Sequence, residues 1–552
     1  MTVLSIRQFN GEIPRLPADR LPEGAAQYAK NCDFAHGELR SLKGLGESWT
    51  AGVSPVRSLF TDDGLRFFAW DRPCRAYLHP TIDDTAGRVL YQEHGQGVRV
   101  ALASAMKLSS QNPNEPATSW KAGVKRPTAT IGASVTGTAT DPKNPIAETV
   151  SYVAVAINLW GEESAPSNPV FVEMQHGQTV NLSIAHTPDA GEQALQGIVF
   201  YRTYAATQSA DFFLLNATPI AGSGGNYTYA DSSTATPSTT VLKTAEWDPP
   251  PAAAVNLTPM GNGFFVVSSG RDLVFSEPYR PHAWPYRMTL PHGVVGIIAV
   301  EGGALVTTQA QSYLITGAHP EQVTQQLLPV EQAGWSDTSL ARVGNAAVYA
   351  ANDGLVDLFG GQPSIESSQQ LFTRRDWRDR YGNARQQLRL AAHDGRVLGV
   401  VDPAYPVAPG ASGGNFLLDL NEGGALSRLD VGQTIYAAMT SPVVDTLYLG
   451  TATGVVEFAE GAGSLALEWQ SGDYLYPAPV AFAAGIIDCT GSFTVTIYAD
   501  GVQAHSFAVT TGATPFRLPS VAPAKRWSVK VVGTGSVREI SLAQSFQELK
   551  QV

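Results

Sequence analysis

The sequence predicts an all-β protein, and three observations point to this class. Glycine (53 residues) and proline (36) are abundant while charged residues make up only 16% of the 552 residues, a balance that favours turns and strands over long helices. Asp-Gly and Asn-Gly pairs recur between short apolar runs, where a type I′ turn needs positive φ at both central residues. The clearest runs alternate apolar and polar residues with the period of two that is typical of half-buried strands.

The length predicts several domains, because 552 residues exceed what one hydrophobic core supports and a prior of roughly 150 residues per domain gives about three or four units. We expect a β-propeller with an inserted immunoglobulin- or fibronectin-III-like sandwich and a small C-terminal β domain. The predicted ranges are 1–125 for an N-terminal segment with the first propeller hairpins, 126–247 for the sandwich, 248–465 for the main propeller and 466–552 for the C-terminal domain.

The turn dipeptides predict hairpins along most of the chain. They are Asp63-Gly64, Asn262-Gly263, Asp353-Gly354, Asp394-Gly395 and Asp500-Gly501. Between about residues 262 and 470 such units recur with irregular spacing, and units of about 40 residues suit the radial sheets of a propeller. We expect the hairpins of residues 59–100 to complete it.

The segment from Arg126 to Trp247 differs in composition from its surroundings. Its flanks are rich in Thr, Ala and Pro, as linkers are, and the runs between them alternate like the strands of a sandwich. We expect this domain to be inserted between propeller blades.

Two C-terminal runs show the strand period most clearly. Residues at alternate positions share one face of each strand, and the apolar ones should face a core. In "FTVTIY" these are Phe493, Val495 and Ile497, and in "RWSVKVVG" they are Trp527, Val529 and Val531.

One segment, residues 369–392, breaks the β pattern because it is rich in helix formers. Asp376 and Asp379 partly neutralise it and Trp377 is its one tryptophan, so it lacks the interleaved aromatics of a nucleic-acid surface. A solvated face, or contacts between subunits, is the better interpretation. Its arginines are Arg374, Arg375, Arg378, Arg380, Arg385 and Arg389.

Charge and cysteine usage exclude several classes of protein. The net charge of −12 argues against a dedicated nucleic-acid-reading surface. The cysteines Cys32, Cys74 and Cys489 are widely spaced, so we expect reduced, structural thiols. The first residues lack the apolar run of a signal peptide and "GVVGIIAV" ends at Glu301, which predicts folding in the cytoplasm without a membrane span.

Candidates for catalysis are weak. Ser412 in "GASGG" matches the G-x-S-x-G pattern, but proline-rich sequence precedes it and a strand-like run follows, which indicates a loop instead of a nucleophile elbow. Asp83-Asp84, Glu162-Glu163 and Glu277 are compatible with glycoside hydrolysis without being specific for it. The polar turn "WGEESAPSN" predicts solvated carboxylates at Glu162 and Glu163.

Neither a metal nor a cofactor is predicted, since the ten histidines form no HExxH or HxH pattern and no EF-hand or Walker A sequence occurs. In "FSEPYRPHAWP", residues 275–285, Glu277, Arg280 and His282 could form a triad or could satisfy one another around a tight turn. The prolines at 278, 281 and 285 fix φ and favour the second interpretation, a rigid corner at the exit of a strand.

Several of these segments resemble the tail proteins of bacteriophages. The pieces are "WDPPPAAAVNLTPMGNGFFVVSSGRDLVFSEPYRPHAWP", "GALVTTQAQSYLITG", "VYAANDGLVDLFGG" and "LFTRRDWRD". The N-terminal part is similar to the start of the tail nozzle proteins (tail tubular protein B) of short-tailed phages, with Gly11, "A-x-x-A-x-N-C" at residues 26–32 and "G-x-L-R" at residues 37–40. The resemblance covers residues 1 to about 380 and is looser beyond.

The resemblance implies a non-enzymatic virion component. It implies a propeller-containing subunit that forms a hexameric ring below the adaptor and portal, next to tail fibres or a spike, and lets DNA leave through its lumen. Assembly would take place in the host cytoplasm. A net acidic tube would repel DNA, so we expect a lumen rich in Asp, Glu and polar side chains. The alternatives are a receptor- or glycan-binding or hydrolysing propeller, and a tip hub of a long tail.

Overall fold

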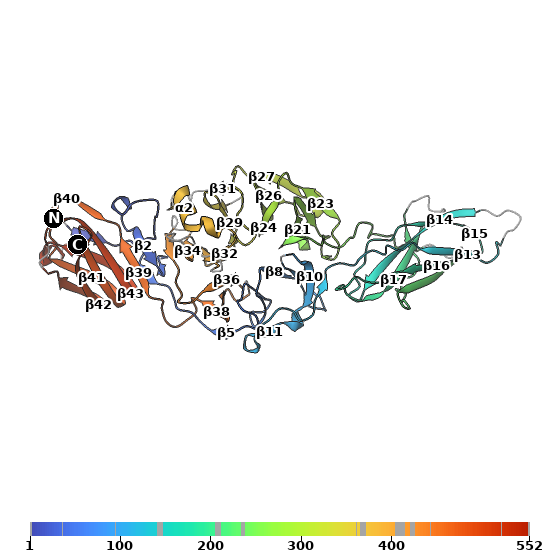
Figure 1. Cartoon of the computed structure of the whole chain (residues 1–552), viewed down its shortest axis with the longest axis horizontal. Helices are drawn as coiled ribbons and strands as arrows, with labels where there is room; N and C mark the ends of the chain where they lie inside the picture. The colour runs from blue at the N-terminus through green and yellow to red at the C-terminus, as the bar shows by residue number, and fades with distance from the viewer. Residues whose placement is uncertain are drawn as a thin grey trace.

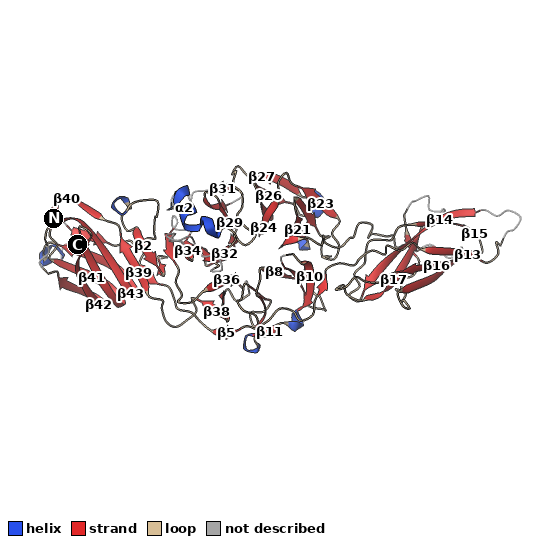
Figure 2. Cartoon of the chain, in the orientation of Figure 1, coloured by secondary structure: helices blue, strands red, loops and turns tan. Residues whose placement is uncertain are grey.

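The computed structural model of the chain describes residues 3–35, 37–93, 95–140, 147–204, 211–232, 234, 238–359, 362–364, 371–402, 414–419, 425–441, 443–519 and 522–549. Strands dominate these residues and helices are few and short (Figure 2). The predicted all-β class is therefore confirmed.

Three β regions follow one another along an elongated molecule (Figure 1). A sheet that holds both chain termini forms one end, a ring of small sheets forms the middle, and two sheets packed face to face form the other end. We call these regions the terminal sheet, the ring and the sandwich.

The ring contains, in the described residues, seven antiparallel groups of three or four strands. All but the sixth in chain order are separate sheets, and the sixth is joined to the terminal sheet by a parallel strand pairing. The first two are β6 (Ser58–Thr61), β7 (Arg66–Trp70) and β11 (Lys107–Leu108), and β8 (Cys74–Leu78), β9 (Arg88–Glu93), β10 (Gly97–Leu102) and β12 (Trp120–Lys121). The third and fourth are β20 (Val255–Pro259), β21 (Phe265–Ser269), β22 (Asp272–Phe275) and β23 (Tyr286–Thr289), and β24 (Val294–Val300), β25 (Gly303–Thr308), β26 (Ser312–Thr316) and β27 (Thr324–Leu327).

The last three sheets follow in chain order. They are β28 (Leu340–Val343), β29 (Ala346–Ala351), β30 (Gly354–Phe359) and β31 (Gln362–Ser364); β32 (Leu388–His393), β33 (Arg396–Val401), β34 (Phe416–Asp419) and β35 (Ala425–Arg428); and β36 (Ile435–Thr440), β37 (Leu447–Thr451) and β38 (Gly454–Phe458) with β5 (Ser48–Thr50).

The first strands of these sheets make a closed cycle of contacts, in the order β6, β8, β20, β24, β28, β32, β36 and back to β6. The seventh sheet is completed by β5, which pairs antiparallel with β38 and sets Trp49 opposite Val455. β5, from near the start of the chain, thus completes a sheet whose other strands lie about 400 positions later in the sequence.

All five predicted hairpins are confirmed, because each turn dipeptide joins two paired antiparallel strands. Both residues have positive φ at Asn262-Gly263, Asp394-Gly395 and Asp500-Gly501, as a type I′ turn requires. At the other two turns only the glycine does.

The sandwich is inserted between β12 and β20 of the ring. One sheet contains β13 (Gly132–Thr136), β16 (Thr179–Ala185) and β19 (Asn226–Ser232), and the other contains β14 (Ala147–Asn158), β15 (Val170–Gln175), β17 (Leu195–Arg202) and β18 (Phe213–Leu214). Tyr152 and Phe200 of one sheet share a buried core with Leu182 and Tyr227 of the other.

The terminal sheet joins the two ends of the chain. It contains β39 (Leu467–Ser471), β40 (Tyr474–Val480), β41 (Ala484–Ala499), β42 (Val502–Arg517) and β43 (Ala524–Ala543), with β1 (Val3–Ile6), β2 (Ala26–Lys30), β3 (Cys32–Asp33) and β4 (Leu39–Ser41). The predicted apolar faces of β41 and β43 are buried as expected.

The domain range 1–125 needs correction, because residues 3–41 pair with the terminal sheet and not with the first ring hairpins. β1 lies antiparallel to β43, with Val3 opposite Ala543, and β4 pairs with the same strand. The physical reason is burial: Leu4 and Ile6 complete the core under β41 and β43.

In the described residues, helices lie in connections between strands or after the last strand. The longer one, α2 (Arg374–Tyr381), begins at Thr373, whose hydroxyl accepts a hydrogen bond from the Asp376 amide while the Asp376 side chain accepts one from the Thr373 amide. It ends at Gly382, and the residues from 388 form β32, so α2 accounts for eight residues of the helix-rich segment.

The remaining helical turns are short. Those with described bounds are α3 (Phe546–Leu549) and 3₁₀ turns at Ala18–Arg20, Ala103–Ala105, Ser109–Gln111, Gly261–Gly263, Pro320–Gln322 and Gly382–Ala384. Within the described part of the chain, no helix has the length and apolar character needed to cross a membrane.

Candidate functional site

A pocket of about 450 Å³ lies where the first strands of the ring meet, bounded by residues of β6, β8, β24, β28, β32 and β36. Apolar side chains such as Leu59, Tyr77, Leu340 and Met439 form much of its wall. Its ionisable lining consists, among the described residues, of Arg57, Arg75, Arg389, Asp337, Cys74 and Tyr77.

Two of these arginines share one buried carboxylate. Nε of Arg57 donates to Oδ2 of Asp402 at 2.9 Å, and the Arg389 guanidinium lies 3.7 Å from the same oxygen. Nη1 of Arg389 also donates to the Arg57 carbonyl oxygen at 3.1 Å, whereas its buried Nε has no hydrogen-bond partner among the residues that the structure describes. Burial lowers the pKa of Arg389, and the Asp402 charge opposes that shift.

Arg75 fixes the opposite side of the pocket through neutral acceptors. Its guanidinium donates to the carbonyl oxygens of Ile297 and Asp337, both at 2.6 Å, and to Oγ1 of Thr258 at 3.1 Å. These bonds tie the second ring sheet to the third and fourth and to the segment before β28. The ring centre is therefore cross-linked by a cationic side chain.

This lining does not suit acid–base hydrolysis of a glycoside, which needs two carboxyl groups facing one substrate. Among the described residues that line the pocket, Asp337 is the one carboxylate, and three guanidiniums line the same pocket. The arrangement presents positive charge to whatever occupies the centre.

The "FSEPYRPHAWP" segment forms the predicted corner. β22 ends at Phe275 and β23 begins at Tyr286, and the Glu277 amide donates to the Ala283 carbonyl across the turn. Tyr279 has a φ of 59°, and its amide donates to the Gly263 carbonyl at 2.8 Å. Backbone bonds thus hold the turn against the β20–β21 connection.

The possible triad in this corner is not formed. Oε2 of Glu277 accepts from the Tyr286 hydroxyl at 2.9 Å, and the Arg280 guanidinium lies 4.0 Å from the other oxygen. His282 instead lies 3.7 Å from Oε1 of Glu162, in the sandwich. The corner therefore contributes His282 to the contact between the ring and the sandwich.

Arg88 is the hub of this joint. Its guanidinium binds Asp84 at 2.9 Å and Glu162 at 2.6 Å, and it lies over the ring of Trp160. The expectation of a solvated Glu162 is wrong, because the side chain is buried and burial raises its pKa against the opposing charge of Arg88. A turn composition could not reveal that the ring covers this turn.

The histidines of the joint are held neutral. Burial, together with the charges of Arg88 and Arg280, lowers the pKa of His282 to about 3. Burial and Arg88 lower the pKa of His79 to about 4, although Asp84 opposes this shift.

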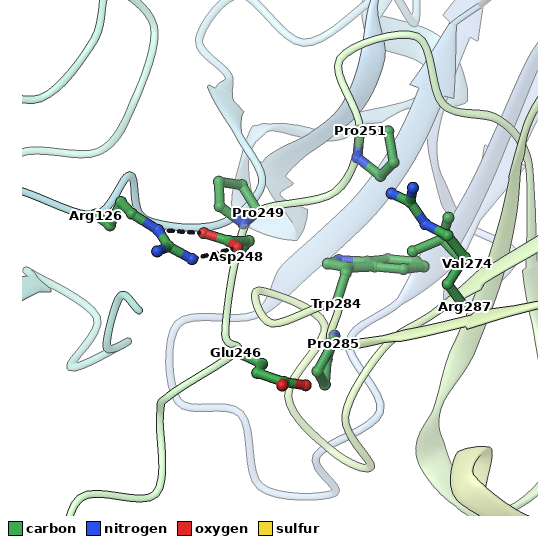
Figure 3. A pocket seen from close by; sticks show the side chains of 9 residues that line it. All are labelled: Arg126, Glu246, Asp248, Pro249, Pro251, Val274, Trp284, Pro285 and Arg287. Carbon is green, nitrogen blue, oxygen red and sulfur yellow. Dashed lines mark hydrogen bonds and ion pairs between the residues drawn. The ribbon is translucent and has the colours of Figure 1, made fainter. Parts of the chain in front are cut away.

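A second pocket of about 380 Å³ lies beside the same joint (Figure 3). Arg126, in the connection into the sandwich, forms two hydrogen bonds with the carboxylate of Asp248, at 2.8 and 2.5 Å. Trp284 forms the floor between Pro249 and Pro285 and donates its indole N–H to the Pro281 carbonyl at 2.8 Å. The pocket thus lies between the two chain connections that enter and leave the sandwich and the corner at residues 275–285.

The arginine-rich segment divides into inward and outward side chains. Arg380 lies 3.7 Å from the buried Glu12, and Arg389 lines the central pocket. The exposed side chains are those of Arg374, Arg375, Arg378 and Arg385. Arg374 binds Asp353 at 2.7 Å, and Arg375 lies 3.6 Å from Asp379. The Arg385 guanidinium lies 5.7 Å from the centre of the Trp335 ring. The exposed four remain predicted contacts with neighbouring subunits.

The buried Glu12 is the site residue that sequence reasoning missed. Its oxygens accept from the Ala29 amide at 3.0 Å and from Nε of Arg428 at 2.8 Å, and its side chain is 2% exposed. Position 12 follows Gly11 in the motif of the N-terminal segment, which was the one available signal.

The other candidates give no site. Ser412 lies outside the described residues. Asp84 is bound to Arg88 as described above, and Cys32, Cys74 and Cys489 are unpaired thiols, with burial raising the pKa of each. Among the residues with a described position, no group of three or more His, Cys, Asp or Glu side chains could hold a metal ion.

Comparisons with known proteins give no family. No family model matches the chain, and no curated protein matches it. Similar solved structures include the extracellular domain of a protein described as a hybrid two component system from B. thetaiotaomicron, at 10% identity and a TM-score of 0.30, with 88% of this chain and 47% of that chain covered. This chain therefore spans about half of that relative.

Another is an exo-beta-1,3-galactanase from Phanerochaete chrysosporium, at 10% identity and a TM-score of 0.20, with 91% of this chain and 99% of that chain covered. TM-scores this low are evidence of neither a shared domain arrangement nor a shared function.

Proposed function

We propose that the chain is a structural subunit of the tail nozzle of a short-tailed phage, built as a seven-bladed β-propeller with an immunoglobulin- or fibronectin-III-like insert and a terminal β domain. The closed cycle of first strands supports the propeller, because radial sheets meet in this way at a propeller axis. The strand β5 that completes the seventh sheet fits the same interpretation.

The observation that carries the proposal is the location of the segments that resemble tail proteins. "SEPYRPHAWP" forms the corner at the sandwich joint. "LFTRRDWRD" contains the start of α2 and ends one residue before Arg380, which reaches Glu12. Gly11 lies so close to the ring that a Cβ there would be 2.3 Å from the Leu426 amide nitrogen. These segments hold three regions in one body, which is the role of a scaffold.

Exposed apolar side chains support assembly into a larger particle. Ile82 is 94% exposed, Leu65 65%, Val443 59% and Tyr279 52%. They lie on connections of four successive ring sheets, and in a propeller those connections share one face. A neighbouring subunit that packs on this face would cover these side chains together.

The proposed partners follow from this role. They are further copies of the chain in a homo-hexameric ring, the adaptor and portal complex, tail fibres or a spike, and DNA that passes through the lumen without sequence-specific binding. The proposed location is the virion tail, assembled in the host cytoplasm.

Electron microscopy and analytical ultracentrifugation of the purified chain test the proposal. We expect a closed ring of subunits, and we expect Ile82→Asp to shift the population toward monomers with an unchanged circular dichroism spectrum. Val502→Asp, at a residue 71% exposed on the terminal sheet, is the matched control and should assemble normally. A monodisperse wild-type monomer that hydrolyses polysaccharide would overturn the proposal.

The alternative of a glycan hydrolase is less well supported, because it calls for converging carboxylates in the central pocket and three arginines lie there. The other alternative, a tip hub of a long tail, uses the same domains. Micrographs of virions that carry the chain separate the two, since the proposed nozzle lies at the end of a short tail.

A further inference from the structure

The central pocket has a feature that a purely structural role for the subunit does not explain. Three guanidiniums, of Arg57, Arg75 and Arg389, come from three separate sheets or their connections and line one pocket. The carboxylates near them are those of Asp337 and Asp402, so the centre carries a net positive charge inside a chain whose net charge is −12.

The ion pairs within the pocket leave hydrogen-bonding capacity unused. Asp402 serves both Arg57 and Arg389, whereas Arg75 has neutral oxygens as its hydrogen-bond acceptors. Nε of Arg389 is buried and has no hydrogen-bond partner in the described part of the chain. An unsatisfied buried donor on a cation is costly, and an acceptor that carries negative charge would remove that cost.

We propose that the ring centre binds a phosphate group, either as free phosphate or as part of a nucleotide. Arginine matches phosphate oxygens through paired N–H donors, and guanidiniums from several sheets can surround a tetrahedral anion. The volume of about 450 Å³ lies within the range of small-molecule sites. The wall of Leu59, Tyr77 and Met439 offers apolar surface to a base or sugar.

A bound phosphate would also act on the fold. It would contact the first, second and sixth ring sheets together, because Arg57 lies beside β6, Arg75 lies in β8 and Arg389 lies in β32. A ligand that binds the folded ring and not the unfolded chain stabilises the folded ring by mass action. The ligand would therefore reinforce the ring at its centre, in addition to the strand pairing at its rim.

Isothermal titration calorimetry on the full-length chain tests this inference. The probes are inorganic phosphate and AMP, each measured against sodium chloride at matched ionic strength. We expect one site per chain, with at least about tenfold weaker binding in Arg389→Gln, because a charge-assisted hydrogen bond is lost. Arg378→Gln, an exposed arginine on α2, is the matched control and should bind as the wild type does.

Each outcome has a defined meaning. Tighter binding of AMP than of phosphate assigns the site to a nucleotide, and the reverse assigns it to free phosphate. Absence of heat for both probes, or equal affinity in wild type and Arg389→Gln, overturns the proposal. Should Arg389→Gln fail to fold, Arg389→Lys keeps the charge and removes the Nε donor, and it should still weaken binding.

Discussion

The sandwich and the terminal sheet are attached to the ring in different ways. No strand of the described sandwich pairs with a ring strand. Side chains around Arg88, Glu162 and His282 make that joint, together with a backbone hydrogen bond from the Lys121 amide to the Gly191 carbonyl. At the other end β2 pairs with both β35 of the ring and β39 of the terminal sheet, and the buried Glu12 reinforces it. One joint therefore depends on ionisable groups, and the other combines them with backbone pairing.

The largest effect is expected at the backbone-paired joint. Glu12→Ala removes the acceptor of Arg428 and of the Ala29 amide, and breaking a buried pair on one side costs about 3–5 kcal/mol. Urea unfolding followed by tryptophan fluorescence measures the loss. Glu38→Ala, in the partly exposed pair with Arg40, is the control and should cost less than about 1 kcal/mol. Equal losses in the two variants would contradict the assignment.

At the side-chain joint, Arg88→Gln should separate the sandwich from the ring without unfolding either. The change leaves Glu162 buried without its cation, at a cost of about 2–3 kcal/mol. We expect faster proteolysis of the connection at 238–254 and a broader distance distribution in small-angle scattering. If both measurements match the wild type, Arg88 is not the hub.

The side-chain joint should also weaken in acid. A histidine whose folded pKa is below 6.5 binds fewer protons in the folded state, so stability falls as the pH drops from about 6.5 toward the folded value. For His282, with a pKa of about 3, the loss at pH 5 is about 2 kcal/mol. His79 and Asp84 act in the same direction, and the raised pKa of Glu162 acts against them.

Melting curves between pH 7 and pH 4 measure this dependence. His282→Asn should flatten the change of stability with pH, whereas His505→Gln, on the terminal sheet, should leave it intact. A wild-type melting temperature that does not change over this interval would show that protonation opens the joint without lowering the stability of the regions that it connects.

The smallest effect is expected for Arg126→Gln. The pair with Asp248 has good geometry, but its side chains are 38% and 50% exposed, and exposed pairs contribute about 0.2–1 kcal/mol. We expect a change near the error of the measurement in low salt and none in 0.5 M salt. A loss comparable to that of Arg88→Gln would show that the joint extends to the pocket of Figure 3.

Local chemistry explains which features could be predicted from the sequence. Turn dipeptides located five hairpins because the requirement for positive φ is local. Alternation identified the buried face of Phe493, Val495 and Ile497 for the same reason. The three prolines of the 275–285 segment likewise indicated a corner without any knowledge of its neighbours.

The rest depended on contacts between distant positions. Glu162 lies in a sequence typical of a solvated turn, yet Arg88, 74 positions earlier, buries it. Glu12 and Arg428 are 416 positions apart, and the three arginines of the central pocket come from separate regions of the chain. No local pattern carries such information, so the candidate site could not be assembled from the sequence.

The strand β5 has a consequence for biosynthesis. Residues 48–50 leave the ribosome early, but their partner β38 is made more than 400 residues later. At about 5–20 residues per second, the early strand waits roughly 20–80 seconds for its pairing. During that time its edge and the apolar surface of the first two sheets are exposed, which makes this interval the one in which the nascent chain most needs protection from aggregation.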